Sequence, residues 1–191
     1  MIVTPIGKPR EMYRGKVYRI LDQDVRHPDG TTGTYEFVEK KAGVIVIALD
    51  KDGRTALVRE RRALRPGEKE RWALPGGEVE PGETPELAAA RELLEEVGCK
   101  GKLEFFSRRP QEPRVIWDVR AFVVAKCRNS KDAPVASGEK LEVKWMPLME
   151  AVHLAMEGEF ELDFAALTLL QYAARNNRIE LLEKEIDPRL R

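Results

Sequence analysis

The chain has 191 residues, of which 42% are hydrophobic, so it is long enough for one domain with a sizeable core. Its 33 basic and 33 acidic side chains balance at pH 7, which argues against a broad basic surface and against nucleic acid as a partner. Two cysteines without a CxxC pattern favour a reduced cytoplasmic protein, with a disulfide between them as the alternative. No apolar signal core at the start and no apolar run of about 18 residues predict a soluble protein that does not enter a membrane.

The first 40 residues are predicted to form an antiparallel strand pair. Residues 15–21 and 34–38 alternate apolar and polar side chains, and Pro28-Asp29-Gly30 between them is a turn sequence. Two strands alone are marginal in water, so the pair must pack on the main body of the protein or on another subunit.

The remaining residues, 41–191, are predicted to form the main domain. A buried strand at 42–49 and a strand at 54–59 are separated by a turn, which predicts a hairpin. Strands interleaved with one central helix and one or two terminal helices predict an α/β fold around a mixed sheet. The other expected strands are 102–107, 115–125 and 141–146, and the expected helices are 85–97, 149–156 and 164–174, with 180–185 as an extension or last turn.

The central helix has clear start and stop signals. Thr84 can cap it, Pro85 suits the first helical position, and Gly98 is placed to end it in the left-handed conformation. The apolar residues at three- and four-residue spacing, which we expect to form its buried stripe, are Leu87, Ala90, Leu94 and Val97.

Three acidic side chains of this helix share a face at spacing i, i+3 and i+4: Glu92, Glu95 and Glu96. They could simply be a solvated surface, which is the usual reason for a charge run. Like charges repel, however, and a hard divalent cation such as Mg²⁺ or Mn²⁺ would stabilise them. The preceding Gly76-Gly77 turn lets backbone approach such an ion closely.

The segment from Gly77 to Cys99, GEVEPGETPELAAARELLEEVGC, fits the pattern G-x5-E-x7-R-E-U-x-E-E-x-G-U, where U is apolar. This pattern is the Nudix box, and the chain resembles the Nudix hydrolases. The resemblance implies an α/β/α sandwich with an N-terminal antiparallel strand pair. It also implies hydrolysis, with Mg²⁺ or Mn²⁺, of nucleoside diphosphates linked to another moiety.

The same resemblance implies roles for the residues of the box. Glu92 and Glu96 would be the principal metal ligands, Glu95 a further ligand, and Gly76 would offer its carbonyl. Arg91 and Glu83 would pair to hold helix and loop in place for catalysis.

Outside the box the likeness is to ADP-ribose pyrophosphatases. It rests on residues 13–17, 28–30, 36–39, 43–49 and 57–62. In that subfamily N-terminal strands cross to a partner, so the resemblance implies a homodimer in which residues 1–40 serve dimerisation and substrate binding.

The subfamily resemblance also implies residues that complete the site. A loop glutamate would assist the attacking water, with Glu139 as the candidate and Glu142, in an expected strand, as the alternative; either could instead be a surface charge. The substrate-binding candidates are Tyr18, Tyr35 and Phe37 for adenine, and Arg59 and Arg61 for phosphate or ribose. Each aromatic could equally be core, and the arginines could be solvated.

Two features depart from the subfamily. Leu74-Pro75-Gly76-Gly77 lacks the alanine often found before the box glycine, and the residues after Pro113 do not resemble the usual continuation. We expect ADP-ribose as substrate because of the N-terminal likeness. The two departures keep three alternatives open. These are another nucleotide sugar or dinucleoside polyphosphate, a nucleoside triphosphate, and a non-catalytic nucleotide-sugar sensor.

Overall fold

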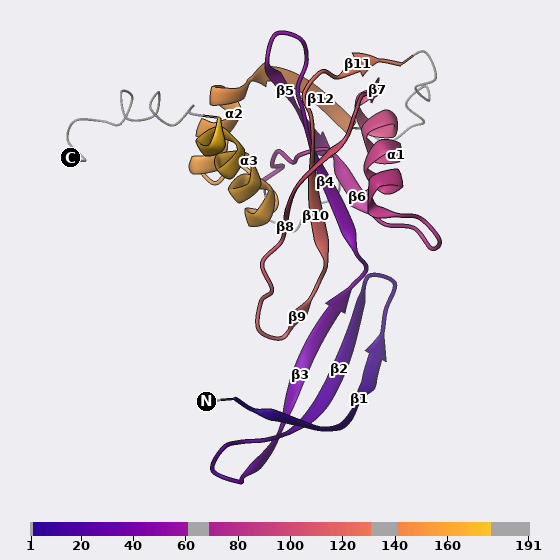
Figure 1. Ribbon diagram of the computed structural model, residues 1–191, viewed down its shortest axis with the longest axis vertical. Helices are drawn as coiled ribbons and strands as arrows, with labels where there is room; N and C mark the ends of the chain where they lie inside the picture. Colours follow the sequence, from indigo (N-terminus) through magenta and orange to yellow (C-terminus); the bar gives the residue numbers. More distant parts are fainter. Residues whose placement is uncertain (1, 61–68, 131–140, 177–191) are drawn as a thin grey trace, which may run out of the picture. The chain divides into compact units, whose positions relative to one another are not determined.

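The computed structural model describes residues 2–60, 69–130 and 141–176 (Figure 1). They fall into two compact units. The first takes the chain up to Gly43 together with Arg108–Val119, and the second takes Val44–Ser107 and the described residues from Arg120 onward. Within the described ranges, none of the helices is long and apolar enough to span a membrane.

The first unit is a four-stranded sheet in the order β1-β2-β3-β9. Its hairpin of β2 and β3 pairs from Tyr18–Lys40 to Arg26–Thr32 across the turn at Pro28-Asp29-Gly30, as predicted. β9 joins β3 in parallel. The strand bounds are β1 (Thr4–Arg14), β2 (Tyr18–Arg26), β3 (Thr32–Lys40) and β9 (Val115–Ile116).

The predicted strand pair is thus part of a larger sheet. Its strand β1 was not expected from the sequence. Its side chains are exposed along its whole length, so it lacks the alternation that marks a half-buried strand. As an edge strand it tolerates Pro5 and Pro9, and its register shifts twice along β2. Gln23 of β2 helps to hold it by donating from Nε2 to the Ile6 carbonyl at 2.9 Å.

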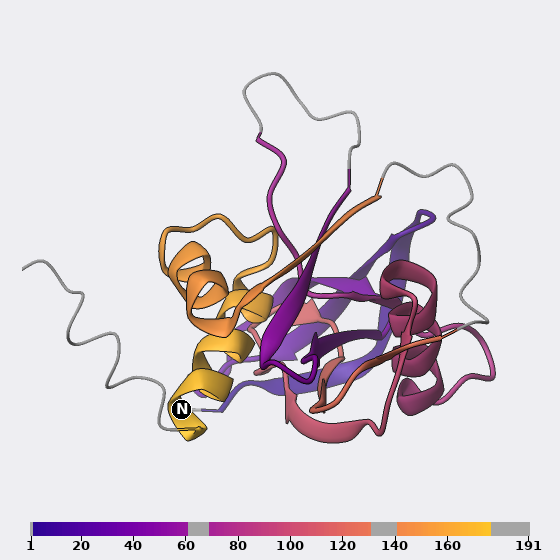
Figure 2. The ribbon, with the colours of Figure 1, turned by 90° about the horizontal axis from the view of Figure 1, so that it is seen from above.

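The second unit contains a four-stranded sheet in the order β6-β4-β10-β8, together with the pairs β12-β5 and β11-β7. Helix α1 lies on one side of these strands, and α2 and α3 lie on the other (Figures 1 and 2). The predicted α/β/α layering is confirmed. The strands are β4 (Gly43–Ala48), β5 (Arg54–Glu60), β6 (Gly76–Glu78), β7 (Cys99–Lys100), β8 (Glu104–Arg108), β10 (Val119–Val124), β11 (Arg128–Asn129) and β12 (Leu141–Pro147). The helices are α1 (Pro85–Val97), α2 (Leu148–Met156) and α3 (Asp163–Arg175).

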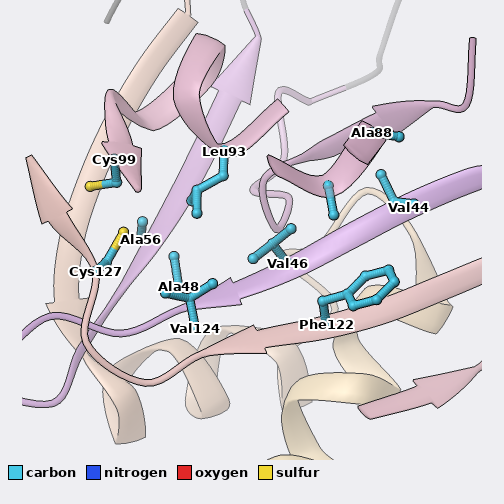
Figure 3. Close-up of a cluster of buried hydrophobic side chains, with 11 residues drawn as sticks. Val44, Val46, Ala48, Ala56, Ala88, Leu93, Cys99, Phe122, Val124 and Cys127 are labelled. Atoms are coloured by element: carbon cyan, nitrogen blue, oxygen red, sulfur yellow. The ribbon is translucent and has the colours of Figure 1, made fainter. Parts of the chain in front are cut away.

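The core beneath α1 is apolar and small-residue-rich (Figure 3). Every residue of β4 is buried, as expected for a strand covered on both faces. The alternate β4 residues that join this core, with Ala88, Ala89 and Leu93 of α1, are Val44, Val46 and Ala48.

Two predicted strand assignments were wrong. β5 follows β4 across the predicted turn, where Leu49 just after β4 bridges Thr55, but the ladder of β5 is with β12. The expected strand 115–125 is two strands in different sheets, β9 and β10. The break falls at Trp117 and Asp118, where the Asp118 carbonyl accepts from the Gly43 N–H instead of continuing one ladder.

Candidate active site

Helix α1 begins and ends at the predicted residues. Thr84 is extended, and its side chain accepts from the Leu87 N–H at 3.3 Å. Pro85 occupies the first helical position, and Gly98 closes the helix with φ of 70°, a left-handed conformation that costs glycine little. These local signals determine where each glutamate of the helix stands.

The buried face of α1 differs from the predicted stripe. Leu87 is 59% exposed and Ala90 is exposed, whereas Ala88, Ala89 and Leu93 are buried. The face is rotated by about one residue because the next positions along it, Glu92 and Glu96, are turned toward β6. Of the predicted stripe Val97 packs against the core, but the periodicity of apolar residues alone did not identify the fully buried positions.

Glu92 and Glu96 both meet the two-glycine segment of β6. Glu96 Oε2 accepts a hydrogen bond of 2.9 Å from the Gly76 N–H. Glu92 Oε1 lies where a side chain at Gly77 would begin, since a Cβ there would be 2.2 Å away. A Cβ at Gly76 would lie 2.1 Å from the backbone carbonyl oxygen of Val44. Both positions therefore need glycine for close approach.

Arg91 binds the surrounding carboxylates together. Its Nε donates to one carboxylate oxygen of Glu83 and a terminal nitrogen donates to the other, each at 3.1 Å. This is the fork geometry that guanidinium favours. Its other terminal nitrogen donates to Glu92 at 2.8 Å and to Glu95 at 3.2 Å. A further bond of 3.0 Å reaches the Glu78 carbonyl in β6. The Arg91–Glu83 pair implied by the resemblance is present.

The charges of this cluster shift one another. The hydrogen bond from Arg91 lowers the pKa of Glu83, and the same bond raises the pKa of Arg91. Burial is the main cause that raises the pKa of Glu92, with the negative charges of Glu95 and Glu83 adding to it against the attraction of Arg91. Three carboxylates, those of Glu83, Glu92 and Glu95, thus surround one guanidinium.

These residues fit a hard divalent cation by the chemistry of their donors. Across the described parts of the chain, no three acidic, histidine or cysteine side chains are already gathered as a complete ligand group. Glu92 and Glu96 nevertheless lie one turn apart and converge on Gly76 and Gly77. Carboxylate and carbonyl oxygens are the ligands that Mg²⁺ and Mn²⁺ prefer, and a cation would stabilise the desolvated, negatively surrounded Glu92. Glu95, with its side chain 49% exposed, could reach the ion directly or through water.

Two of the other predicted residues are engaged with each other. Arg59 pairs with Glu142, the residue opposite it on β12, at 2.6 Å. Its guanidinium also lies 4.5 Å from the ring centre of Trp72, a stacking partner that the sequence did not reveal. Glu139 and Arg61 lie outside the described residues.

Strand alternation places Arg59 and Glu142 away from α1. Ala56 packs in the core beneath α1, and Trp145 opposite it packs against the same core. Side chains three residues further along a strand point to the other face, so Arg59 and Glu142 face the opposite side of this strand pair. This orientation weakens the case for Glu142 as the group that assists water.

The three candidate adenine-binding aromatics do not share one face of their sheet. Tyr35 and Phe37 are alternate residues of β3 and lie on one face, whereas Tyr18 pairs directly with Lys40 and lies on the other. Tyr18 is 47% exposed, and Lys40 Nζ lies 5.4 Å from its ring centre. The three rings therefore do not form a single aromatic sandwich within one chain.

Comparisons with known proteins find a matching family and similar sequences. The model of the NUDIX domain matches residues 39–167. The chain is 29% identical over 154 residues to a methanol dehydrogenase activator from Bacillus methanolicus, with 78% of this chain and 82% of that protein covered. It is 29% identical over 153 residues to an ADP-ribose pyrophosphatase from Mycobacterium tuberculosis, with 78% and 72% covered.

A solved structure described as an ADP compounds hydrolase has a similar fold. Its TM-score is 0.73 at 21% sequence identity, and the alignment covers 92% of this chain and 97% of that one.

Proposed function

Because the chain belongs to the Nudix family, we propose that it hydrolyses the pyrophosphate of ADP-ribose, with Mg²⁺ or Mn²⁺, to AMP and ribose 5-phosphate. The observation that carries the proposal is the convergence of Glu92 and Glu96 on Gly76 and Gly77. On a solvated helix surface, two glutamates would not turn inward against a pair of glycines. Nor would those two positions need to be glycine to leave room.

The residues of the site divide the work of the reaction. Glu92 and Glu96, with the Gly76 carbonyl, would hold the cation, and Arg91 keeps Glu92 in place while tying α1 to Glu83 and to the Glu78 carbonyl. When bound there, the cation would neutralise charge at the phosphates and lower the pKa of a water. Glu139 would accept the proton of the attacking water, which is a contribution of about 10²–10⁴ in rate for a well-placed base.

ADP-ribose is proposed as substrate from two supports. The N-terminal sequence resembles ADP-ribose pyrophosphatases, and one relative over most of the chain has that name. The Bacillus methanolicus relative has a different name, so other pyrophosphates belong in the test. The homodimer, the cytoplasmic location and the role of residues 1–40 in dimerisation and substrate binding stay predictions.

The test is product analysis with purified protein and either metal. The panel should contain ADP-ribose, other nucleotide sugars, dinucleoside polyphosphates and nucleoside triphosphates. We expect AMP and ribose 5-phosphate to form fastest, with loss of at least about a hundredfold in Glu96→Gln because the cation contributes several kcal/mol. Glu86→Gln, an exposed glutamate in the first turn of the same helix, is the matched control and should stay active.

The other outcomes separate the alternatives. Faster turnover of another pyrophosphate would keep the mechanism and overturn ADP-ribose. Absence of any metal-dependent turnover, with nucleotide binding intact, would identify a sensor. Reaction in ¹⁸O-labelled water adds the position of attack, because the label appears in whichever product carries the attacked phosphorus.

A further inference from the structure

The chain's two cysteines, Cys99 and Cys127, are buried in the same core cluster of the second unit, where their side chains are neighbours (Figure 3). The Cys99 thiol donates to Asn129 Oδ1 at 3.8 Å. Only 1% of Cys99 and 9% of Cys127 is exposed. Neither thiol has a part in the proposed hydrolysis.

The backbone holds the two side chains toward each other. Cys99 pairs with Asn129 in the β7–β11 ladder, and Cys127 precedes Asn129 by two residues, so it projects to the same face. The Cys127 N–H donates to the Leu49 carbonyl at 2.7 Å, which fixes its backbone against the end of β4. A disulfide requires Cβ atoms about 3.5–4.5 Å apart, a separation that neighbouring side chains on one face of paired segments can reach.

Folding determines when such a bond can form. Burial raises the pKa of both thiols, and the reactive species is the thiolate. The folded protein therefore shields the pair, whereas both thiols are accessible with ordinary acidity in the unfolded chain. Once formed and buried, a bond between them would be equally sheltered from reductants.

We propose that Cys99 and Cys127 form an intramolecular disulfide when the chain folds in the presence of a small-molecule disulfide such as oxidised glutathione. One cysteine thiolate attacks a glutathione sulfur, forms a mixed disulfide and releases one glutathione thiolate. The second cysteine thiolate then attacks the protein sulfur of that mixed disulfide and displaces the other glutathione. The chain loses two protons and two electrons, equal to two hydrogen atoms, and two reduced glutathiones are formed.

The bond would act on the helix that carries the acidic cluster. Cys99 directly follows Gly98, the residue that ends α1, and the N–H of Ser130 donates to the Gly98 carbonyl at 2.8 Å. The crosslink would close a loop that contains β8, β9 and β10 and would join the end of α1 to the end of β10. It would stabilise the fold by restricting the unfolded chain. The inference does not depend on the proposed hydrolysis.

The experiment is oxidative refolding of the full chain. Protein unfolded in urea is refolded in mixed reduced and oxidised glutathione, or in dithiothreitol, then treated with N-ethylmaleimide under denaturing conditions. We expect the oxidised sample to carry no N-ethylmaleimide, to weigh two hydrogens less, and to yield one peptide pair joining Cys99 to Cys127. Its urea midpoint should exceed that of the reduced sample, and Cys127→Ala should show no such difference between the two conditions.

Three results would overturn the inference. They are two N-ethylmaleimide adducts or glutathione adducts on folded oxidised protein, links between separate chains, and an intramolecular bond that leaves the urea midpoint unchanged or lower. Cys99→Ala repeats the control if Cys127→Ala does not fold. Comparison of oxidised with reduced wild type needs no variant.

Discussion

Glu96 accepts a hydrogen bond of 2.9 Å from the backbone N–H of Gly76, although twenty residues separate the two in the chain. With Glu92 lying against Gly77, this contact fixes α1 over β6 and brings two carboxylates to one short stretch of backbone. The account of the site depends on this convergence.

The two glycines should respond differently to an added methyl group. In Gly77→Ala the Cβ would displace the Glu92 carboxylate, which is the end of a flexible side chain, so kcat/KM should fall about 10–100-fold with folding retained. In Gly76→Ala the Cβ meets the Val44 backbone, which cannot move aside, so the protein should lose about 1–3 kcal/mol of stability. Kinetics and urea unfolding of both variants measure this; full activity of Gly77→Ala would contradict it.

Arg91→Lys should impair the enzyme although it keeps the charge. Lysine cannot reproduce the fork to both Glu83 oxygens together with the bonds to Glu92 and the Glu78 carbonyl. We expect kcat/KM to fall about 10–100-fold, as for other residues that orient ligands. Glu83→Gln should do the same, and the double variant should cost less than the sum of the two in free energy. Additive losses would show that the two residues act independently.

Glu142→Gln should leave the pH dependence of kcat unchanged. Its carboxylate pairs with Arg59 on the strand face away from α1, and a partly exposed pair of this kind contributes about 0–1 kcal/mol. Glu139→Gln is the matched variant and should lower kcat by about 10² or more, as expected for loss of a base. If Glu142→Gln gives the larger loss and removes the acid limb of the profile, Glu142 is the base.

Mn²⁺ affinity should fall as pH decreases, beginning above the ordinary glutamate pKa of about 4.3. Burial raises the pKa of Glu92, so protons compete with the metal at higher pH than they would at an exposed carboxylate. Calorimetric titration of Mn²⁺ across this range, in buffers with different ionisation enthalpies, measures the protons released on binding. If the number of protons released on Mn²⁺ binding does not change with pH, the assignment of Glu92 as ligand is contradicted.

The family, the enzyme class and the layered fold predicted from the sequence are confirmed. The bounds of α1 were also predictable, because Thr84, Pro85 and Gly98 act on their own turn of backbone. The face that α1 buries was not, because it depends on contacts of Glu92 and Glu96 with β6 that no helical periodicity encodes.

The pairing of β5 and the presence of β1 were missed for different reasons. β5 pairs with β12, more than eighty residues further along, and local turn signals favoured the nearer β4. β1 is held by its backbone ladder and by polar contacts such as the Arg10–Asp24 ion pair, so its side chains show no buried pattern. Likewise, Trp72 lies under Arg59 because the bridge between Val58 and Ala73 brings the two segments together, which no local pattern encodes.

The most direct test of the central claim is Mn²⁺ binding to metal-free protein, followed by the electron paramagnetic resonance signal of the free ion. Wild type, Glu96→Gln and Glu86→Gln should be titrated side by side, with circular dichroism confirming that each is folded. The account predicts saturable binding in wild type and Glu86→Gln and its loss in Glu96→Gln. Equal binding by all three proteins would contradict it, because the cation would then lie away from the carboxylates that meet Gly76 and Gly77.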